Sequence, residues 1–410
     1  MRLIVPQHHI SVAQMGARMH YAVPRVLNRM GLLEHCFLDI CANTGWTRSL
    51  CRIPNGYRPP SLKRLLGRVP KDVPRRQITS FARFGWTYAF RLRCARTPDA
   101  VSRSHLWAGK TFGELVSQES WYDSNVIYAF CDAALEILKT ARQRGVTSVL
   151  EQTIAPREVQ RRVLDEEYDA FPHWERRCTD DSHFDEFVAR QHDEWNQADV
   201  IVCASDYVRD AIRACNGPAE KCCVVPYGIK QAQREYNEEQ SSGPLRVLTV
   251  GSVGLRKGVP YVLAAARELQ RIAEFRIVGP VEVSPVAQDE LRRHVALMGP
   301  VPRAEIRAHY KWADVFLLPS LCEGSATVVY EALTAGLPVI CTHNTGSVVR
   351  DGEEGFIVPI RDSVSIVESL ERLANDRDLR KNMSKNASVR AEEFTLSAYG
   401  QRLAASIPVR

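Results

Sequence analysis

Short apolar runs rich in β-branched residues alternate with longer helix-like stretches through the first half of the chain. The apolar runs lie at residues 3–5, 146–150, 199–204 and 222–226, and the helix-like stretches at 19–30, 128–144 and 157–168. Runs of this length, bounded by polar or turn residues, are typical of parallel strands that are buried on both faces. The alternation predicts a Rossmann-like domain over residues 1–229.

The second half repeats this alternation more regularly. Strands are predicted at residues 245–250, 275–279, 315–318, 338–342 and 356–359, and helices at 259–272, 303–312, 327–335 and 364–375. The pattern predicts a second doubly wound parallel sheet over residues 245–390. Such sheets bind ligands outside the carboxyl ends of their strands, so residues that directly follow strands are the first candidates for a site.

A polar stretch separates the two halves. Residues 230–244 contain no run of apolar residues and end in Gly243-Pro244, which favours a turn. We therefore expect an α/β protein with two Rossmann-like, doubly wound domains that are joined by this linker and face a central cleft. Residues 391–410 are expected to form a C-terminal helix that returns to the first domain.

A glycine-rich turn with two cations follows the first strand of the second half. Gly251, Ser252 and Gly254 come directly after that strand, and Arg256 and Lys257 precede the next helix. Glycines let backbone N–H groups approach an anion, and a helix N-terminus carries partial positive charge. The turn predicts a diphosphate site. A dinucleotide site is a weaker alternative because the glycine spacing is not GxGxxG, and a plain strand-to-helix turn is another.

Two glutamates eight positions apart follow a second strand end. Glu323 comes after the strand at residues 315–318, and Glu331 lies in the helix that follows. Both are expected to face one crevice, where a carboxylate can accept two hydrogen bonds from a vicinal diol. The donor-binding candidates between them are Gly324, Ser325 and Ala326, whose backbone N–H groups are expected to point at the same space. The alternatives are a capping carboxylate for Glu323 and an exposed helical glutamate for Glu331.

With these motifs, residues 245–393 resemble the retaining GT-B glycosyltransferases of family 4. The resemblance rests on the Glu-x7-Glu spacing and the lysine, and it extends to residues 338–340, Gly346 and 351–358. It implies that Glu323 contacts the transferred sugar, that Glu331 holds the ribose of the donor nucleotide, and that Lys257 neutralises the diphosphate. The family's usual arginine is replaced here by Ser252, so its phosphate role is transferred to Arg256.

The first half resembles the family more loosely. Gly16 stands where an acceptor-side glycine loop is usual, and residues 227–228 resemble the turn that ends the first domain. Many members carry a histidine near the reacting sugar, but residues 151–157 contain none. Gln152, together with Glu151, follows a strand end and is the candidate to line the cleft. His8 and His9 are expected to follow the first strand, which makes His9 a further candidate; polar loop residues are the alternative.

The resemblance implies an enzyme that moves a sugar from a nucleotide-diphosphate sugar to an acceptor hydroxyl, with retention of configuration. Arg256 and Lys257 would stabilise the leaving diphosphate, so neither a metal nor another cofactor is expected. Residues 179–181 mimic a metal-binding acidic motif, but no predicted strand precedes them. A sugar-nucleotide epimerase, a phosphorylase and a non-catalytic sugar-nucleotide-binding protein remain alternatives. The acceptor is expected to be a polysaccharide, a lipid-linked glycan or a small glycoside.

The net charge of +6 over 410 residues is concentrated in one segment. Residues 58–103 carry a net charge of +10, so the remainder carries −4. The aromatic residues among these charges are Phe81, Phe84, Trp86, Tyr88 and Phe90. This mixture suits an anionic membrane surface or an anionic lipid-linked acceptor; a solvated basic face over packed aromatics is an equal alternative. Nucleic acid is not expected, because no recognisable binding module accompanies the charge.

Location also follows from the hydrophobic pattern. The apolar run at the N-terminus is too short for a signal peptide, and no later run reaches the length of a membrane-spanning helix. The twelve cysteines are scattered, as expected for reduced thiols in a large chain. We expect a cytoplasmic protein, located at the cytoplasmic face of a membrane if residues 58–103 bind lipid.

Overall fold

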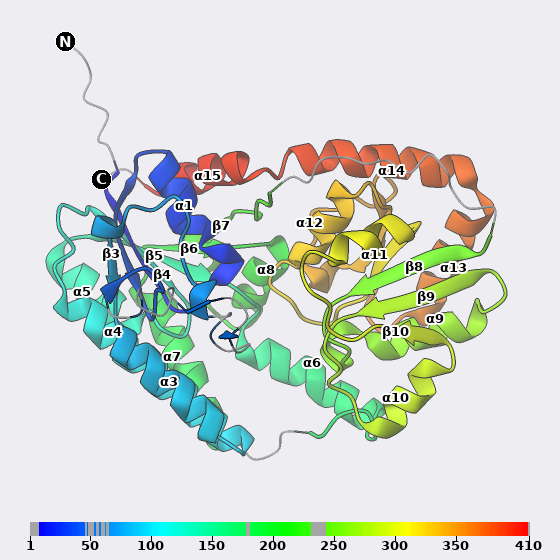
Figure 1. The fold of residues 1–410 in the computed structure, drawn as a ribbon, viewed down its shortest axis with the longest axis horizontal. Coiled ribbons are helices and arrows are strands. Elements are labelled where there is room, and N and C mark those ends of the chain that lie inside the picture. The colour runs from blue at the N-terminus through cyan, green and yellow to red at the C-terminus, as the bar shows by residue number, and fades with distance from the viewer. Residues whose placement is uncertain are drawn as a thin grey trace, which may run out of the picture.

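The computed structural model describes residues 8–45, 47, 53–54, 57–58, 62, 65–177, 181–230 and 243–408. These residues form two lobes, each built around a twisted parallel sheet with helices on both faces (Figure 1). The predicted strand at residues 3–5, most of the predicted linker and the Thr179-Asp180 pair lie outside the described residues. Two doubly wound sheets are the predicted fold class, which is confirmed.

The first sheet has seven strands in the order β3-β2-β1-β4-β5-β6-β7. Every pairing in it is parallel. Its strands are β1 Ile10–Gln14, β2 Leu33–Leu38, β3 Ile78–Ser80, β4 Val126–Phe130, β5 Thr147–Gln152, β6 Val200–Cys203 and β7 Cys222–Val224. The strand order reverses between β1 and β4, so the turns that follow them open a crevice at the carboxyl edge.

The second sheet has six strands in the order β10-β9-β8-β11-β12-β13. These pairings are also parallel. Its strands are β8 Leu245–Val250, β9 Ala273–Val278, β10 Val295–Leu297, β11 Val315–Leu318, β12 Val339–Thr342 and β13 Gly355–Val358. Here the order reverses between β8 and β11, which places the glycine-rich turn after β8 beside the Glu323 turn after β11.

Helices cover both sheets. Those of the first half are α1 Ala22–Arg29, α3 Ala82–Cys94, α4 Pro98–Gln118, α5 Leu135–Arg144, α6 Arg157–Ala170, α7 Phe184–Gln197 and α8 Asp206–Ala214. Those of the second half are α9 Val259–Glu268, α10 Pro285–Arg292, α11 Ile306–Trp312, α12 Thr327–Thr334, α13 Ser363–Asn375, α14 Arg377–Glu392 and α15 Leu396–Ala405. Several begin at a side-chain cap: Thr97, Ser205 and Ser284 each accept a hydrogen bond from the backbone N–H three residues on.

One expectation for the first half is wrong. The predicted helix at residues 128–144 begins only at Leu135, because Val126–Phe130 is a fully buried apolar run that forms the central strand β4. The first described strand, β1, starts at Ile10, in a segment where no strand is predicted. In the second half, β8 and β11 have the predicted bounds.

Helix α6 crosses from the first half of the chain to the second lobe. Trp174, just beyond this helix, belongs to the core of the second sheet. Glu167 on α6 accepts a hydrogen bond from the Tyr261 hydroxyl at 3.0 Å and pairs with Arg361 at 2.5 Å. The sequence segment 1–229 therefore contributes a helix to the packing of the second lobe.

The C-terminal helix crosses in the other direction. After α14, which runs along the second lobe, α15 packs on α1 of the first lobe (Figure 1). Phe394, Tyr399 and Leu403 are buried in the core of the first sheet. The Ile229 backbone N–H also donates to the Phe394 carbonyl at 2.9 Å. The segment around Ile229 and the segment between α14 and α15 thus lie together where the lobes meet.

We predict that Leu403→Ala lowers the free energy of unfolding of the first lobe by ~2–5 kcal/mol, because a fully buried leucine is replaced by a cavity. Thermal unfolding followed by circular dichroism measures this. The matched control is Gln401→Ala on the exposed face of the same helix, which should change stability by no more than ~0.5 kcal/mol. Equal effects of the two variants would contradict the packing of α15 on α1.

Candidate functional site

The turn after β8 depends on its glycines. Gly251 and Gly258 have φ angles of +149° and +69°, where side chains with a Cβ are strained. A Cβ on Gly258 would lie 2.0 Å from the Pro319 carbonyl oxygen, and one on Gly251 would lie 3.2 Å from Cε of Lys257. The turn therefore packs directly against the segment that follows β11, and it carries Arg256 and Lys257 there.

Glu323 binds both cations of this turn. Its Oε1 lies 2.6 Å from Nη1 of Arg256 and 2.5 Å from Nζ of Lys257. Lys257 is only 8% exposed and Glu323 only 9%. Two cations against one carboxylate leave a net positive charge in a partly dehydrated place, where electrostatic attraction is stronger than in water. The cluster is thus suited to an additional anionic group.

Glu331 lies on α12, away from this cluster. It accepts a hydrogen bond from the Tyr310 hydroxyl at 3.0 Å. Burial and the Glu331 carboxylate together raise the pKa of Tyr310, so this tyrosine remains a donor. The two glutamates follow the same strand, but Glu331 is outside the described lining of the cavity that contains Glu323.

Gly324 is where the two lobes come closest at the site. A Cβ on Gly324 would lie 1.9 Å from the Thr153 carbonyl oxygen. The Ala155 N–H donates to the Glu323 carbonyl at 3.3 Å, and the Ser205 hydroxyl donates to the Gly324 carbonyl at 2.5 Å. The backbone that follows β5 and the Ser205 hydroxyl that follows β6 thus contact the Glu323–Gly324 turn of the second lobe.

Some of the groups expected to face a ligand already have partners. The Ala326 N–H donates to the Thr345 carbonyl at 3.2 Å, so the expectation that this amide points into the crevice is wrong. The Ser325 hydroxyl donates to the Gly346 carbonyl and lies 2.8 Å from the Tyr330 hydroxyl. Next to Gly254, the Leu255 N–H donates to the Glu175 carboxylate at 2.5 Å, a contact that the sequence did not indicate.

A cavity of about 320 Å³ lies between the two lobes, in front of Glu323. Its second-lobe lining is Arg256, Glu323, Gly324, Ser325 and Thr327, and its first-lobe lining is Arg18, Met19, Val23, Phe130, Glu151, Thr153, Ile154 and Tyr227. Its size is at the lower end of the ~300–1,000 Å³ typical of ligand pockets. The cavity therefore places residues of the predicted donor side opposite residues of the first lobe.

Of the two neighbouring candidates at the end of β5, Glu151 and not Gln152 lines the cavity. Gln152 is buried, and its amide bonds to the Trp195 indole at 2.9 Å and to the Ile154 carbonyl at 2.8 Å. Its neighbour Glu151 lines the cavity instead, because successive strand residues point to opposite faces. Gly16 lies in the turn after β1 with φ +79°, and its carbonyl accepts a hydrogen bond from the Gln14 amide.

His9 lies at the opposite edge of the first sheet. It precedes β1, its ring lies 3.3 Å from the Glu34 carboxylate, and its N–H donates to Asn125 at 2.8 Å. The strand at residues 3–5 that His8 and His9 are expected to follow lies outside the described residues, so that expectation stays a prediction. The run from Ile10 forms a buried strand. Its apolar pattern is interrupted by Ser11 and Gln14, so the sequence does not predict it clearly.

A strained loop before α1 brings two side chains to the cavity. Met19, His20 and Tyr21 have φ angles of +45°, +53° and +60°. Each non-glycine residue in this conformation costs ~1–2 kcal/mol, and such strain is often found at functional sites. Arg18 and Met19 in this loop line the cavity. No glycine pattern in residues 18–21 predicts this conformation.

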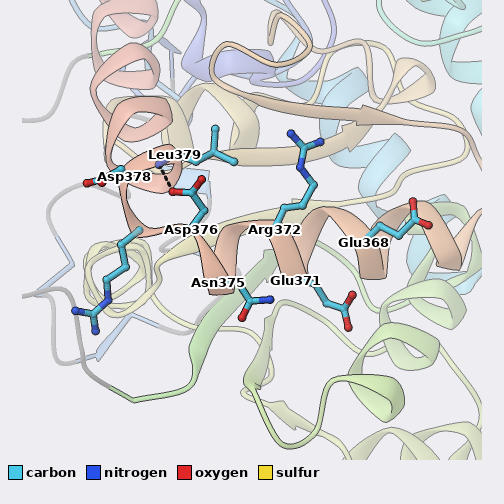
Figure 2. Close-up of a pocket in the computed structure, with 8 residues that line it drawn as sticks. Glu368, Glu371, Arg372, Asn375, Asp376, Asp378 and Leu379 are labelled. Carbon is cyan, nitrogen blue, oxygen red and sulfur yellow. Dashed lines mark hydrogen bonds between the residues drawn. The ribbon is translucent and has the colours of Figure 1, made fainter.

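A second hollow lies where α13 meets α14, and Figure 2 shows its polar lining. It has a volume of about 850 Å³ and is formed by Glu368, Glu371, Arg372, Asn375, Asp376, Arg377, Asp378 and Leu379. Asp376 accepts a hydrogen bond from the Leu379 N–H at 2.8 Å and so caps α14. This hollow contains none of the predicted site residues, and one of its acidic groups, Asp376, has a structural role as the cap.

Within the described ranges, no three histidine, cysteine or acidic side chains are grouped as a metal site would require. The expectation that no metal takes part stays a prediction. None of the described helices has both the length and the apolar character needed to cross a bilayer.

The chain matches known sequences mainly in its second half. The family model for glycosyl transferases group 1 matches residues 231–390. Over 230 residues the chain is 27% identical to α-D-kanosaminyltransferase of Streptomyces kanamyceticus, covering 51% of this chain and 60% of that relative. It is 28% identical over 195 residues to the amylovoran biosynthesis glycosyltransferase AmsK of Erwinia amylovora, covering 43% and 48%. The matches thus span about half to three fifths of these curated relatives.

Solved structures match nearly the whole chain. HepE of Anabaena, in complex with UDP and glucose, superimposes with a TM-score of 0.61, 14% identity, and coverage of 97% of this chain and 99% of HepE. Sucrose-phosphate synthase of Thermosynechococcus elongatus gives a TM-score of 0.62 at 15% identity, covering 97% and 98%. At these identities the likeness shows the fold, including the arrangement of both sheets.

We predict that Gly324→Ala separates the lobes at the cavity, because the new Cβ cannot be accommodated 1.9 Å from the Thr153 oxygen. Small-angle scattering should show an increased radius of gyration. The control is Gly299→Ala, which meets nothing within 4 Å but has φ +67°; it should cost ~1–2 kcal/mol of stability and leave the radius unchanged. An unchanged radius for Gly324→Ala would contradict the close contact.

Proposed function

We propose that this chain transfers a sugar from a nucleotide-diphosphate sugar to an acceptor hydroxyl. The proposal is supported by the GT-B fold and by the match of residues 231–390 to the glycosyl transferases group 1 family model. The observation that carries the proposal is the buried cluster of Glu323, Arg256 and Lys257 in front of the cavity. The cluster combines two cations for a diphosphate with a carboxylate for sugar hydroxyls.

In this reaction the bond between C1 of the sugar and the diphosphate oxygen breaks. Positive charge then grows on the sugar ring and negative charge on the leaving diphosphate. Lys257 and Arg256 are preorganised next to the position of that negative charge, an effect usually worth several kcal/mol in the transition state (~3–4 kcal/mol per group). We propose that this replaces a metal ion, and that the reaction proceeds with retention.

Donor binding changes the partners of the two cations. In the described state Glu323 pairs with both side chains; a bound diphosphate would share them, and the carboxylate would turn to the hydroxyls of the transferred sugar. Glu331, held by Tyr310, would accept hydrogen bonds from the ribose. Each charge-assisted hydrogen bond of this kind contributes ~1.5–3 kcal/mol.

We predict that Glu323→Ala and Glu331→Ala fail at different steps. Loss of Glu323 should lower the rate of sugar transfer by ~10²-fold or more and retain nucleoside diphosphate binding, because the cations remain. Loss of Glu331 should weaken nucleotide binding by ~10–100-fold, as expected for the loss of ~1.5–3 kcal/mol. Thermal shifts and product analysis by mass spectrometry with a panel of nucleotide sugars measure both effects.

The control for both variants is Glu368→Ala, which removes an exposed glutamate of the second hollow and should change neither step. Intact transfer in Glu323→Ala would contradict the role of this carboxylate. An isomerised donor as the product would indicate an epimerase instead, and donor binding without any product would indicate a binding protein.

The structure divides the aromatic residues of the basic segment into two groups. Phe84 is buried, and Phe81 and Tyr88 are half-buried on α3 and its start. Trp86 and Phe90 are 43% and 67% exposed. The buried and half-buried aromatics fit a solvated basic face over packed aromatics, whereas Trp86 and Phe90 remain exposed for contact with another surface.

We propose that the exposed face of α3 binds an anionic membrane surface, from which a lipid-linked acceptor would reach the cavity. Arg83, Trp86, Phe90 and Arg93 are spaced three or four residues apart and are all exposed, so they share one face of the helix. A face that combines arginine with exposed aromatic side chains suits the boundary between headgroups and acyl chains.

We predict that the protein binds liposomes containing phosphatidylglycerol, that binding weakens as salt rises, and that the double variant Phe90→Ala/Arg93→Gln reduces it. Co-sedimentation measures the bound fraction. Arg292→Gln on α10 of the second lobe, an exposed arginine outside α3, is the control and should bind as the unmodified chain does. Binding that is indifferent to both salt and anionic lipid would contradict the proposal.

A further inference from the structure

A buried carboxylate lies on the first-lobe wall of the cavity. Glu151, near the end of β5, is only 2% exposed and yet belongs to the cavity lining. Its Oε2 accepts a hydrogen bond from the Tyr128 hydroxyl at 2.7 Å, and its Oε1 accepts one from the Tyr227 hydroxyl at 3.0 Å. Glu323 lies on the second-lobe wall of the same cavity.

The Glu151 carboxylate can accept more hydrogen bonds than the two that Tyr128 and Tyr227 donate. A carboxylate offers about four acceptor positions, and each Glu151 oxygen receives one tyrosine hydrogen bond. Burial in this place raises the pKa of Glu151, opposed by the Tyr128 hydrogen bond and by the charge of Arg18. Burying a carboxylate costs free energy unless it is paired or hydrogen-bonded. A ligand that fills the cavity and excludes water should therefore donate hydrogen bonds to the remaining acceptor positions of Glu151.

The carboxylate is held in place by surrounding packing. Tyr128 on β4 is fully buried. The Tyr227 ring packs edge-on against Tyr399 of α15, with ring centroids 6.1 Å apart. Three distant segments of the chain therefore fix Glu151, as binding constellations require for accurate placement of a ligand.

Around Glu151 the cavity wall contains both apolar and charged side chains. Met19, Val23, Phe130 and Ile154 supply apolar surface, and Arg18 supplies a cation. Within the part of the chain that the structure describes, no side chain or carbonyl pairs with the Arg18 guanidinium. Carbohydrates suit such a wall, because a sugar ring presents C–H faces as well as hydroxyl groups that can donate to a carboxylate and accept from a guanidinium.

We propose that Glu151 and Arg18 form the subsite for the acceptor, and that the acceptor is a sugar whose hydroxyls donate to Glu151. Arg18 donates to oxygens of the same sugar. The acceptor then lies in the cavity with one further hydroxyl directed across it to the sugar that Glu323 holds. This subsite rests on the proposed function, since it names the acceptor class of the same reaction.

The test is direct binding of free sugars to the full chain. UDP, GDP, ADP and dTDP are first compared by thermal shift, and the protein is loaded with the nucleotide that stabilises it most, or used unloaded if none does. Saturation-transfer difference NMR then measures binding of D-glucose, D-galactose, D-mannose and N-acetyl-D-glucosamine. We expect at least one to bind, and Glu151→Gln to weaken that binding at least tenfold while the nucleotide thermal shift is retained.

Two further variants separate binding from folding. Arg18→Ala should weaken sugar binding because it removes a proposed hydrogen-bond donor. The side chain is exposed, so the melting temperature should not fall. This variant tests the proposal if Glu151→Gln does not fold. Glu194→Gln removes another fully buried carboxylate of the first lobe, one that accepts hydrogen bonds from three backbone N–H groups. It should lower the melting temperature and leave sugar affinity unchanged.

The proposal is overturned if none of the four sugars binds the unmodified chain, or if Glu151→Gln and Arg18→Ala bind sugar as the unmodified chain does. Failure of the proposed function gives a different result, because no nucleotide would then stabilise the protein. A nucleotide thermal shift without sugar binding refutes the subsite alone.

Discussion

The buried pairing of Glu323 with Lys257 and Arg256 is the interaction on which the site depends. The three side chains come from the turns after β8 and β11, which lie side by side because the strand order reverses between them. Removing one member of a buried ion pair leaves an uncompensated charge and costs ~3–5 kcal/mol. The two turns are therefore bound to each other, and the second cation leaves these three side chains with an excess positive charge.

The same cluster constrains the first lobe. Because the turn at Gly324 contacts the Thr153 carbonyl directly, the end of β5 is positioned by the donor-side turn rather than by its own sheet alone. The crossing of α6 to Tyr261 and Arg361 fixes a second contact between the lobes. Both contacts hold the first-lobe wall of the cavity against the second lobe.

Much of the second lobe could be predicted from the sequence because its signals are local. β11 is an uninterrupted apolar run, β8 is mainly apolar, and the glycines and Glu323 follow them within a few residues. The first lobe lacks such signals. Its first strand contains Ser11 and Gln14, and the left-handed residues 19–21 are not glycines. Strand register decides whether Glu151 or Gln152 faces the cavity. Two adjacent polar residues at a strand end do not reveal that register in the sequence.

This contrast has a physical basis in how each half of the site is assembled. The second-lobe wall of the cavity, the predicted donor side, comes from two turns of one sheet, so a short motif suffices to specify it. The first-lobe wall comes from the loop before α1, the end of β5, Tyr227 and, through Tyr399, the C-terminal helix. Substitutions in any of these segments can reshape the first-lobe wall while the pairing of Glu323 and Lys257 is kept. A GT-B fold can therefore conserve its donor chemistry and still vary the acceptor it receives.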